Sequence, residues 1–293
     1  MSSQLQQSKI AFIGGGNMAA AIIGGLTAKG IDKQNVTVSE PWDVNRAKMA
    51  ETGVRTTTSN SDAARDADIV ILAVKPQVAR GVCEELAGAF APSSSSSSSS
   101  QPLIISIVAG ITAESLGKWL SKSGGGGEAN APHIVRVMPN TPALVGEGAS
   151  GLFAGSDVTA AEKELAAALL SSVSKATEWV DREELLDVVT GLSGSGPAYF
   201  FALVEHLTAS ATALGLSPEQ ATRLAKQTCL GAGRMLAESA EAPAQLRRNV
   251  TSPKGTTEAA LQSFEASGFA AIVDKAVKAA TDRAGELGKT LGG

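Results

Sequence analysis

A glycine-rich turn near the start of the chain constrains its fold more than any other feature. A short apolar run ends at Ile13, the pattern GxGxxA follows from Gly14 to Ala19, and an alanine-rich stretch comes next, which Gly30 can terminate. In such a strand–turn–helix the first glycine permits the tight turn, and the second removes a side chain that would block a pyrophosphate. The helix N-terminus adds amide donors and a positive dipole. The pattern predicts a dinucleotide site. Its predicted contacts are Gly14, Gly15, Gly16, Asn17, Met18 and Ala19.

The first half of the chain alternates β-branched apolar runs with helical stretches. The predicted strands are Lys9–Gly14, Val36–Glu40, Asp68–Val74, Leu103–Ala109, His133–Met138 and Ala149–Ala154. This alternation predicts an α/β fold, a parallel sheet covered by helices, in a Rossmann-type N-terminal domain. After about Asp181 the pattern changes to long helical stretches. These are Ala198–Leu214, Pro218–Ala240 and Thr256–Leu291. We therefore expect two domains, 1–183 and an all-helical 184–293.

Two low-complexity stretches interrupt the first domain. One is a run of eight serines at 93–100, and the other is a run of glycines at 124–127. Each lies between a helical pattern and the next strand, so we expect flexible surface insertions without chemistry.

Composition excludes several classes of partner. The net charge of -4 and the pI near 5.4 give no general attraction for nucleic acid or anionic lipid. The start of the chain lacks an apolar targeting segment, and no stretch reaches the ~20 apolar residues that span a bilayer. A cytoplasmic protein is expected. Cys83 and Cys229 lie far apart without CxxC spacing, so neither a disulfide framework nor a metal site is expected; both should be buried as small hydrophobes.

The residues after the second predicted strand leave the cofactor open. Glu40 follows the turn at about the 20-residue spacing of an acid that binds ribose hydroxyls, which favours NAD. Ser39, Asn45 and Arg46 would instead receive the 2′-phosphate of NADP with Glu40 turned away. Lys75 follows a predicted strand at the sheet edge where ligands of open α/β sheets bind, and is a further candidate neighbour of the cofactor.

A second motif precedes the last helical stretch. Ser252 is the predicted N-cap and Pro253 the predicted first helical residue. The amides and hydroxyls gathered here suit a substrate carboxylate, although an ordinary capped helix shows the same pattern. A third cluster, Thr190–Tyr199, contains three glycines that permit close approach of a ligand or of another helix.

The chain offers few acid catalysts. Its two histidines, His133 at the start of a strand and His206 within a helix, are expected to be structural. Reduction of a ketone creates an alkoxide that needs a proton donor, whereas a protonated imine becomes a neutral amine. An imine substrate therefore fits, with Thr257 as a hydroxyl that hydrogen-bonds the ring nitrogen.

At these residues the sequence resembles the pyrroline-5-carboxylate reductases over nearly its full length. The matching motifs are GGGNMA at 14–19, AVKPQ at 73–77, VAGIT at 108–112, RVMPNTP at 136–142, TGLSGSGPAY at 190–199 and VTSPKGTT at 250–257. The resemblance implies a helical C-terminal dimerisation domain that interlocks with its partner, dimers that often assemble into decamers, and active sites between protomers. It implies reduction of the C=N bond of L-1-pyrroline-5-carboxylate to L-proline, the last step of proline biosynthesis. The cofactor would be NADP(H), with NAD(H) as the alternative.

The resemblance also assigns residues to the site. Besides the turn, the implied cofactor contacts are Ser39, Glu40, Asn60, Ala73, Val74, Lys75, Pro76, Ala109 and Gly110. The implied substrate contacts are Thr251, Ser252, Gly255, Thr256 and Thr257, the last being the catalytic candidate. Lys254 stands where the family usually has a glycine, so a positive φ there would be strained and a helical one would not.

Two other functions remain. A reductase of β-hydroxyacids or of other imines would share the architecture, but the β-hydroxyacid enzymes generally need a lysine on the first helix of the second domain, and 198–214 has none. A non-catalytic dinucleotide sensor would keep the turn without needing the motif at 252–257.

Overall fold

The computed structural model describes residues 3–90, 101–121 and 132–291. The insertions predicted at 93–100 and 124–127 lie outside these residues. By contacts, the chain divides into two units, 1–194 with 280–293, and 195–279. The domain boundary that we predict after residue 183 stays a prediction.

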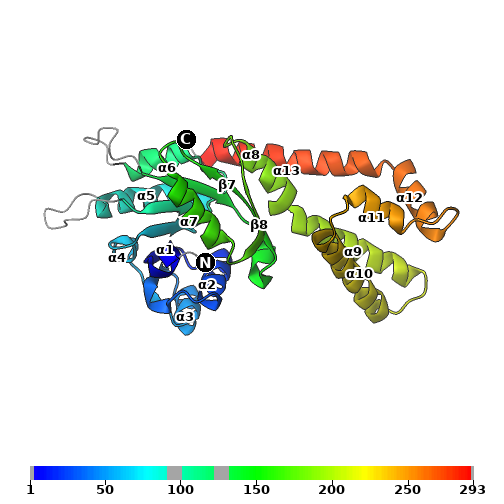
Figure 1. The fold of residues 1–293 in the computed structure, drawn as a ribbon, viewed down its shortest axis with the longest axis horizontal. Coiled ribbons are helices and arrows are strands. Elements are labelled where there is room, and N and C mark those ends of the chain that lie inside the picture. Colours follow the sequence, from blue (N-terminus) through cyan, green and yellow to red (C-terminus); the bar gives the residue numbers. More distant parts are fainter. Residues whose placement is uncertain (1–2, 91–100, 122–131, 292–293) are drawn as a thin grey trace. The chain divides into compact units, whose positions relative to one another are not determined.

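The first unit is built on one sheet (Figure 1). Among the described residues its strands are β1 (Ile10–Ile13), β2 (Val36–Ser39), β3 (Arg55–Thr57), β4 (Ile69–Leu72), β5 (Leu103–Ser106), β6 (Ile134–Met138), β7 (Gly148–Ala154) and β8 (Ser174–Trp179). Their order is β3-β2-β1-β4-β5-β6-β7-β8. The crossover between β3 and β4 places β1 beside both β2 and β4, which is the arrangement that binds dinucleotides at the carboxyl ends of the strands.

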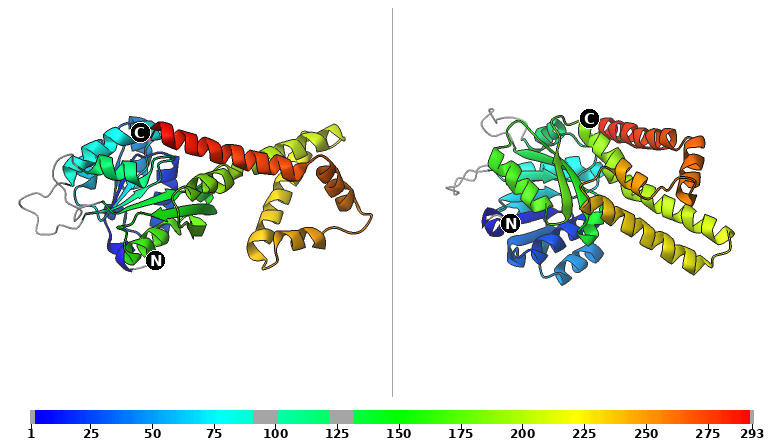
Figure 2. Two further views of the ribbon diagram at one scale, coloured as in Figure 1. Left: turned by 90° about the horizontal axis from the view of Figure 1, so that it is seen from above. Right: turned by 45° about the vertical axis from the view of Figure 1, so that its right-hand side comes forward.

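Helices cover both faces of this sheet (Figure 2). They are α1 (Ser3–Gln7), α2 (Asn17–Ala28), α3 (Asp43–Glu51), α4 (Asn60–Ala64), α5 (Pro76–Ala89), α6 (Ala113–Leu120), α7 (Ala160–Leu170) and α8 (Leu185–Val189). Short 3-10 turns occupy Lys33–Asn35 and Thr141–Val145, and a π-helical turn occupies Thr190–Gly194.

Alternation along β1 explains the two cores. Ile10 and Phe12 point to a core formed with α1, α2, α3 and α7, whereas Ala11 and Ile13 point to a core formed with α4, α5 and α6. All four residues are almost completely buried. Because the sheet is buried on both faces, its central strand is apolar at every position.

The sheet differs from the predicted one in three strands. The sheet is parallel as predicted in its other pairings, but β7 runs antiparallel to β6. Only a 3-10 turn joins these strands, whereas a parallel pair needs a longer crossover. β3 and β8 were not predicted. Their sequences, Arg-Thr-Thr and Ser-Lys-Ala-Thr-Glu-Trp, carry the polar side chains of edge strands and lack an apolar run.

The second unit is helical. It contains α9 (Gly196–Ala213), α10 (Pro218–Glu238), α11 (Pro243–Asn249), α12 (Thr256–Ala266) and the beginning of α13 (Phe269–Leu291). The single helix predicted over 256–291 is interrupted at Gly268, whose φ of 73° belongs to the left-handed region. Helix α10 carries a capping box, in which the Ser217 hydroxyl accepts from the Gln220 amide.

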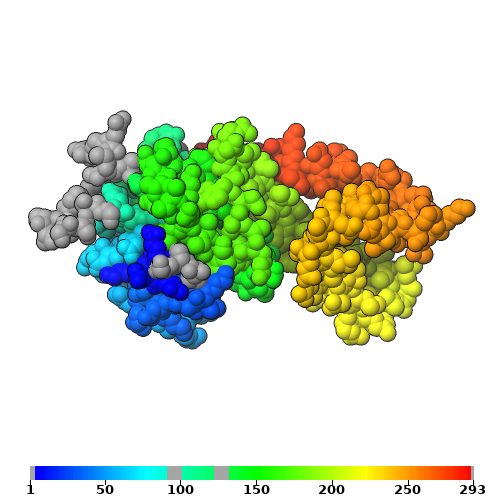
Figure 3. All heavy atoms as spheres, viewed as in Figure 1, coloured from blue at the N-terminus to red at the C-terminus, as the bar shows by residue number. Residues whose placement is uncertain are grey.

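The second unit has almost no core of its own. Between 195 and 279 only Gly196 and Ala221 are buried. Large apolar side chains are exposed instead, among them Phe201 at 69% and Leu224 at 60%. Figure 3 shows the outer face of α10 and α11, in yellow to orange. A helical unit with so much apolar surface needs a further layer to cover it.

The two cysteines differ in burial. Cys83 is buried on α5, and burial, with a smaller contribution from the charge of Glu84, raises the pKa of its thiol to about 12. Cys229 on α10 is half-buried, so the expectation that both cysteines are buried is wrong for this residue.

Candidate functional site

The predicted glycine turn lies between β1 and α2. Gly14 has a φ of 103°, and its N–H donates to the Ser39 carbonyl at 2.8 Å. A Cβ at this position would come within 2.5 Å of the Ala73 carbonyl oxygen. Both the backbone conformation and the space beside β4 therefore require glycine.

Helix α2 presents an open N-terminus at the end of this turn. Gly16 is the N-cap, with no side chain to cap the first amides, and a Cβ on it would meet nothing within 4 Å. Asn17 is exposed and Met18 half-buried, whereas Ala19 is buried where α2 packs on the sheet. Free amides, a positive helix end and open space are what a pyrophosphate needs. The turn therefore fits a dinucleotide.

Glu40 turns back toward the glycine turn. It follows β2 and is 8% exposed. Its Oε2 accepts from the Gly15 N–H at 2.8 Å, and its Oε1 accepts from the Trp42 N–H at 2.9 Å. Both oxygens of the predicted ribose-binding acid are thus already bonded to backbone amides.

The other polar groups near the end of β2 form two further sets of hydrogen bonds. The fully buried Ser39 donates through Oγ to Asn60 Oδ1 at 2.7 Å, and Asn60 Nδ2 donates to Glu85 Oε2 at 2.8 Å. Arg46 donates to the Glu40 carbonyl at 3.0 Å and pairs with Asp43. Of the Ser39–Asn60 pair, only the half-buried Asn60 is accessible at this edge.

The predicted contacts on the neighbouring strands divide into two groups. Ala73 to Pro76 lead from β4 into α5, with Lys75 exposed as the N-cap residue. Ala109 is exposed after β5. A Cβ on Gly110, whose φ is 78°, would lie 3.1 Å from the Gly288 backbone nitrogen. The close approach that Gly110 permits is made by the end of α13.

The substrate motif forms one turn before α12. The Thr251 hydroxyl donates to the Arg247 carbonyl at 2.6 Å, and the Gly255 N–H donates to the Ser252 carbonyl at 3.0 Å. Gly255, not Ser252, is the N-cap, so the predicted cap and the predicted helical Pro253 are wrong. A tight turn over 252–255 delays the helix. Thr256 and Thr257 then occupy its first two positions, where side-chain hydroxyls and free amides lie together.

Lys254 adopts a left-handed conformation in this turn. Its φ is 59°. Among the described residues, Lys254 is the only one other than glycine with a positive φ. Its backbone N–H donates to Glu258 Oε2 at 2.7 Å. The strained alternative that the sequence left open at this position is thus the observed one.

Two motifs of the resemblance have structural contacts with each other. Asn140, 8% exposed, donates from Nδ2 to the Ser193 carbonyl at 3.1 Å and accepts from the Ala149 N–H at 2.9 Å. A Cβ on Gly194 would lie 2.6 Å from Met138 Cε. At Gly194, the close approach that glycine permits is therefore to another part of the protein. His133 is likewise engaged, with its Nδ1 2.7 Å from Glu162 Oε1.

Sequence reasoning missed a charged cavity of about 470 Å³ in the first unit. Its lining includes Arg136, whose side chain is 9% exposed and whose Nη1 lies 2.8 Å from Glu183 Oε1. Asp187 lies in the same wall, and its pKa is raised by burial and by the charges of Glu183 and Glu184. An arginine inside a buried strand was the signal that could have revealed it.

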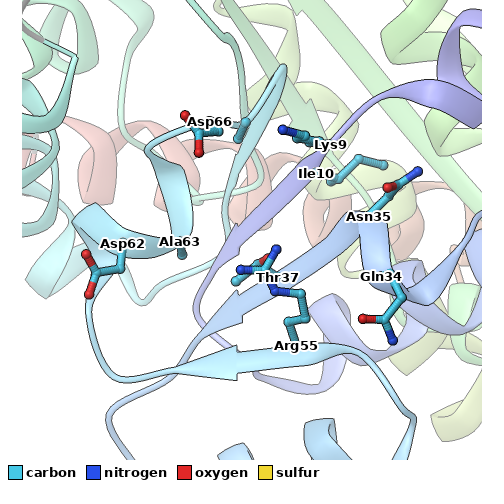
Figure 4. Close-up of a pocket in the computed structure, with 10 residues that line it drawn as sticks. Lys9, Ile10, Gln34, Asn35, Thr37, Arg55, Asp62, Ala63 and Asp66 are labelled. Atoms are coloured by element: carbon cyan, nitrogen blue, oxygen red, sulfur yellow. The ribbon is translucent and has the colours of Figure 1, made fainter. Parts of the chain in front are cut away.

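A smaller cavity lies at the opposite edge of the sheet. Figure 4 shows Lys9, Asn35 and Arg55 close to the beginnings of β1, β2 and β3. Its volume of about 90 Å³ is far below that of small-molecule sites. In the described residues, no group of three or more metal-binding side chains occurs, and no helix is long and apolar enough to cross a membrane.

Two family models match the chain. Residues 9–110 match a model described as coenzyme F420-dependent NADP oxidoreductase, and residues 183–287 match one described as pyrroline-5-carboxylate reductase dimerisation. A Rossmann-type sheet with an open glycine turn, followed by a helical unit, defines a two-domain oxidoreductase that binds a nicotinamide dinucleotide.

Full-length relatives identify the family. A pyrroline-5-carboxylate reductase of Pseudomonas aeruginosa is 49% identical over 97% of this chain and 98% of its own. The chain belongs to the pyrroline-5-carboxylate reductase family. Among solved structures, such a reductase from Coxiella burnetii is 41% identical, with a TM-score of 0.85 over 96% of this chain and 98% of its own. One from Plasmodium falciparum with NADP bound is 30% identical, with a TM-score of 0.80 over 97% and 99%.

Proposed function

We propose that this chain reduces L-1-pyrroline-5-carboxylate to L-proline with NADPH. The observation that carries the proposal is the turn before α12, where Thr256 and Thr257 begin a helix with free amides. Such a helix end holds a carboxylate without a basic side chain. Family membership over nearly the whole chain supports the same substrate.

The chain's residues mainly position the substrate in this reaction. The carboxylate is held by Ser252, Gly255 and Thr256 at the turn, and the Thr257 hydroxyl hydrogen-bonds the ring nitrogen. Among the described residues the Thr257 hydroxyl has no hydrogen-bond partner, so it is available to do this. The bound nicotinamide supplies a hydride to the imine carbon. Because the protonated imine becomes a neutral amine, no acid catalyst is required at that step.

NADP(H) is the proposed cofactor, with NAD(H) as a weaker second. The support is the orientation of Glu40, whose two carboxylate oxygens are bonded to the amides of Gly15 and Trp42. A carboxylate turned into the protein does not hydrogen-bond the ribose hydroxyls of NAD(H). It also does not repel the 2′-phosphate of NADP(H). The half-buried Asn60, like Asn45 and Arg46, is an accessible polar residue at this edge. The remaining predicted contacts are retained as cofactor neighbours.

A homodimer formed through the second unit is the proposed assembly, with decamers as the higher form. The support is the near absence of buried residues between 195 and 279, together with the match to the dimerisation model. Intertwined helices of a second copy would cover Phe201, Leu224 and their apolar neighbours. Light scattering of the purified chain measures the assembly directly.

Steady-state kinetics tests the proposal. The purified chain is given 1-pyrroline-5-carboxylate with NADPH and, in parallel, NADH, and loss of reduced cofactor is followed by absorbance. We expect proline as the product and a higher kcat/KM with NADPH. A folded oligomer that turns over neither cofactor would favour the sensor function. Turnover of a β-hydroxyacid with oxidised cofactor, but none of the imine, would favour the other reductase.

A further inference from the structure

Glu40 forms a buried bridge between the glycine turn and the segment after β2. Its Oε2 accepts from Gly15 at 2.8 Å and its Oε1 from Trp42 at 2.9 Å, while its own carbonyl accepts from Arg46 at 3.0 Å. The side chain is therefore held by two hydrogen bonds and the backbone of the same residue by a third. With 8% of its surface exposed, little of the residue remains to meet a ligand.

The turn is built around this carboxylate. A Cβ on Gly15 would lie 3.1 Å from Met49 Cγ, 3.3 Å from Glu40 Oε2 and 3.3 Å from Glu40 Cβ. Gly15 does not have a positive φ, so its backbone would accept alanine. The absence of a side chain at position 15 is thus explained by the space that Glu40 and Met49 take up, and not by backbone conformation.

We propose that Glu40 is a positioning residue that fixes the pyrophosphate-binding turn, and that it does not select between the two cofactors through their ribose. Bonding of Gly15 to Glu40 holds the middle of the turn, and bonding of Gly14 to the Ser39 carbonyl holds its beginning. Gly16 and the first amides of α2 are thereby set before the ligand arrives. Such preorganisation strengthens binding of any dinucleotide pyrophosphate.

The inference rests on the proposed dinucleotide site and not on the proposed substrate. Its test is therefore binding alone: the dissociation constants of NADPH and NADH are measured for the full-length oligomer by cofactor fluorescence, without pyrroline carboxylate. For Glu40→Gln we expect both constants to rise about tenfold, with their ratio changed by less than about threefold. Tenfold corresponds to about 1.4 kcal/mol, in the range of one hydrogen bond to a charged group.

Two further variants separate the bridge from the charge. Glu40→Asp keeps the charge but is too short to bond both amides, and Gly15→Ala keeps Glu40 but adds a Cβ that crowds both Glu40 and Met49. We expect each to weaken NADPH and NADH in parallel. Because all three variants break the same bridge, Gly15→Ala combined with Glu40→Gln should weaken binding little more than either change alone. The exposed Glu51, at the end of α3, provides a matched control, and Glu51→Gln should leave both constants unchanged.

The alternative outcomes are distinct. If the dissociation constant of NADH rises tenfold or more in Glu40→Gln while that of NADPH is unchanged, Glu40 is a ribose-binding residue and the inference is overturned. Unchanged binding of both cofactors would overturn it as well. An unmodified chain that binds neither cofactor would overturn the proposed dinucleotide site itself. Melting temperatures of the variants identify any that fail to fold, and Glu40→Asp and Gly15→Ala then supply the comparison.

Discussion

The backbone N–H of Lys254 donates a 2.7 Å hydrogen bond to Glu258 Oε2, across the beginning of α12. This contact helps to hold Lys254 at a φ of 59°. Glycine, which has no Cβ, adopts this left-handed conformation readily, asparagine and aspartate tolerate it, and other residues are disfavoured in it. The turn that presents Thr256 and Thr257 is therefore maintained against a local cost. The resemblance implied glycine at this position, and the structure gives the physical reason for it.

Lys254→Gly should stabilise the protein. Glycine adopts a positive φ without the clash of a Cβ, and the hydrogen bond to Glu258 uses only the backbone and is retained. Part of this gain is offset by the greater freedom of glycine in the unfolded chain. We expect a net gain of roughly 0.5–1 kcal/mol in the free energy of unfolding, measured by urea denaturation.

Lys254→Ala is the matched control for this change. It removes the same charge and the same aliphatic stem but keeps a Cβ, so the strain persists and no comparable gain is expected. If alanine stabilises as much as glycine, the lysine side chain and not the backbone conformation is responsible.

Glu183→Ala should destabilise the first unit strongly. Glu183 Oε1 accepts from Arg136 at 2.8 Å and from the Ala113 N–H at 2.6 Å. Removal of the carboxylate leaves the guanidinium, 9% exposed, without its ion-pair partner at 2.8 Å. The expected loss is about 3 kcal/mol, read from the shift of the urea midpoint.

Neighbouring residues make this prediction specific. Glu183→Gln, which keeps an oxygen acceptor, should cost less than the alanine change. Glu184→Ala removes an exposed carboxylate from the same segment and should change stability by no more than about 0.5 kcal/mol. Equal effects at 183 and 184 would contradict a special role for the Arg136–Glu183 ion pair.

Asp187→Asn should stabilise the protein at neutral pH. Burial is the largest effect and raises the pKa of Asp187 above its ordinary value of 3.8; the charge of Arg136 is the largest opposing effect, Glu183 and Glu184 raise the pKa further, and Lys289 lowers it. A raised pKa in the folded state means that the protonated form is favoured by folding. The contribution to stability is thus full below pH 3.8 and is lost as the pH rises through the folded-state pKa. The melting temperature of the variant should exceed that of the unmodified chain near pH 7, with the difference shrinking on acidification. A constant difference at every pH would assign the effect to packing.

The parts of the fold that sequence predicted best are those with strong local patterns. In the run from Ile10 to Ala19, the apolar residues and the glycine spacing predict a strand, a turn and the start of a helix. The structure confirms all three. By contrast, the direction of β7 depends on how short its connection is, and β3 and β8 depend on pairing with strands already in place. Such long-range pairing leaves little trace in a polar edge sequence.

The candidate site divides in the same way. Residue types identified the turn and the motif before α12, because both rely on glycine, hydroxyls and helix ends. They did not reveal the orientation of Glu40, since a carboxylate after β2 has the same sequence position whether it faces the ribose or Gly15. The displaced N-cap at Gly255 was missed for a related reason: Ser252-Pro253 has the composition of a helix start, but Lys254 takes a left-handed turn instead.

Thr257→Ala should depress turnover while leaving NADPH binding nearly unchanged. Thr257 is the second residue of α12, half-buried, and its hydroxyl is proposed to bond the ring nitrogen as the imine is reduced. Loss of one hydrogen bond at the reacting nitrogen would lower kcat about tenfold, equivalent to about 1.4 kcal/mol in the barrier. Thr257→Ser keeps the hydroxyl and should retain most of the activity. Steady-state kinetics with 1-pyrroline-5-carboxylate gives kcat, and fluorescence titration without substrate gives the NADPH dissociation constant. A variant that loses NADPH affinity instead would place Thr257 in the cofactor site, because a contact confined to the substrate cannot alter binding of the cofactor alone.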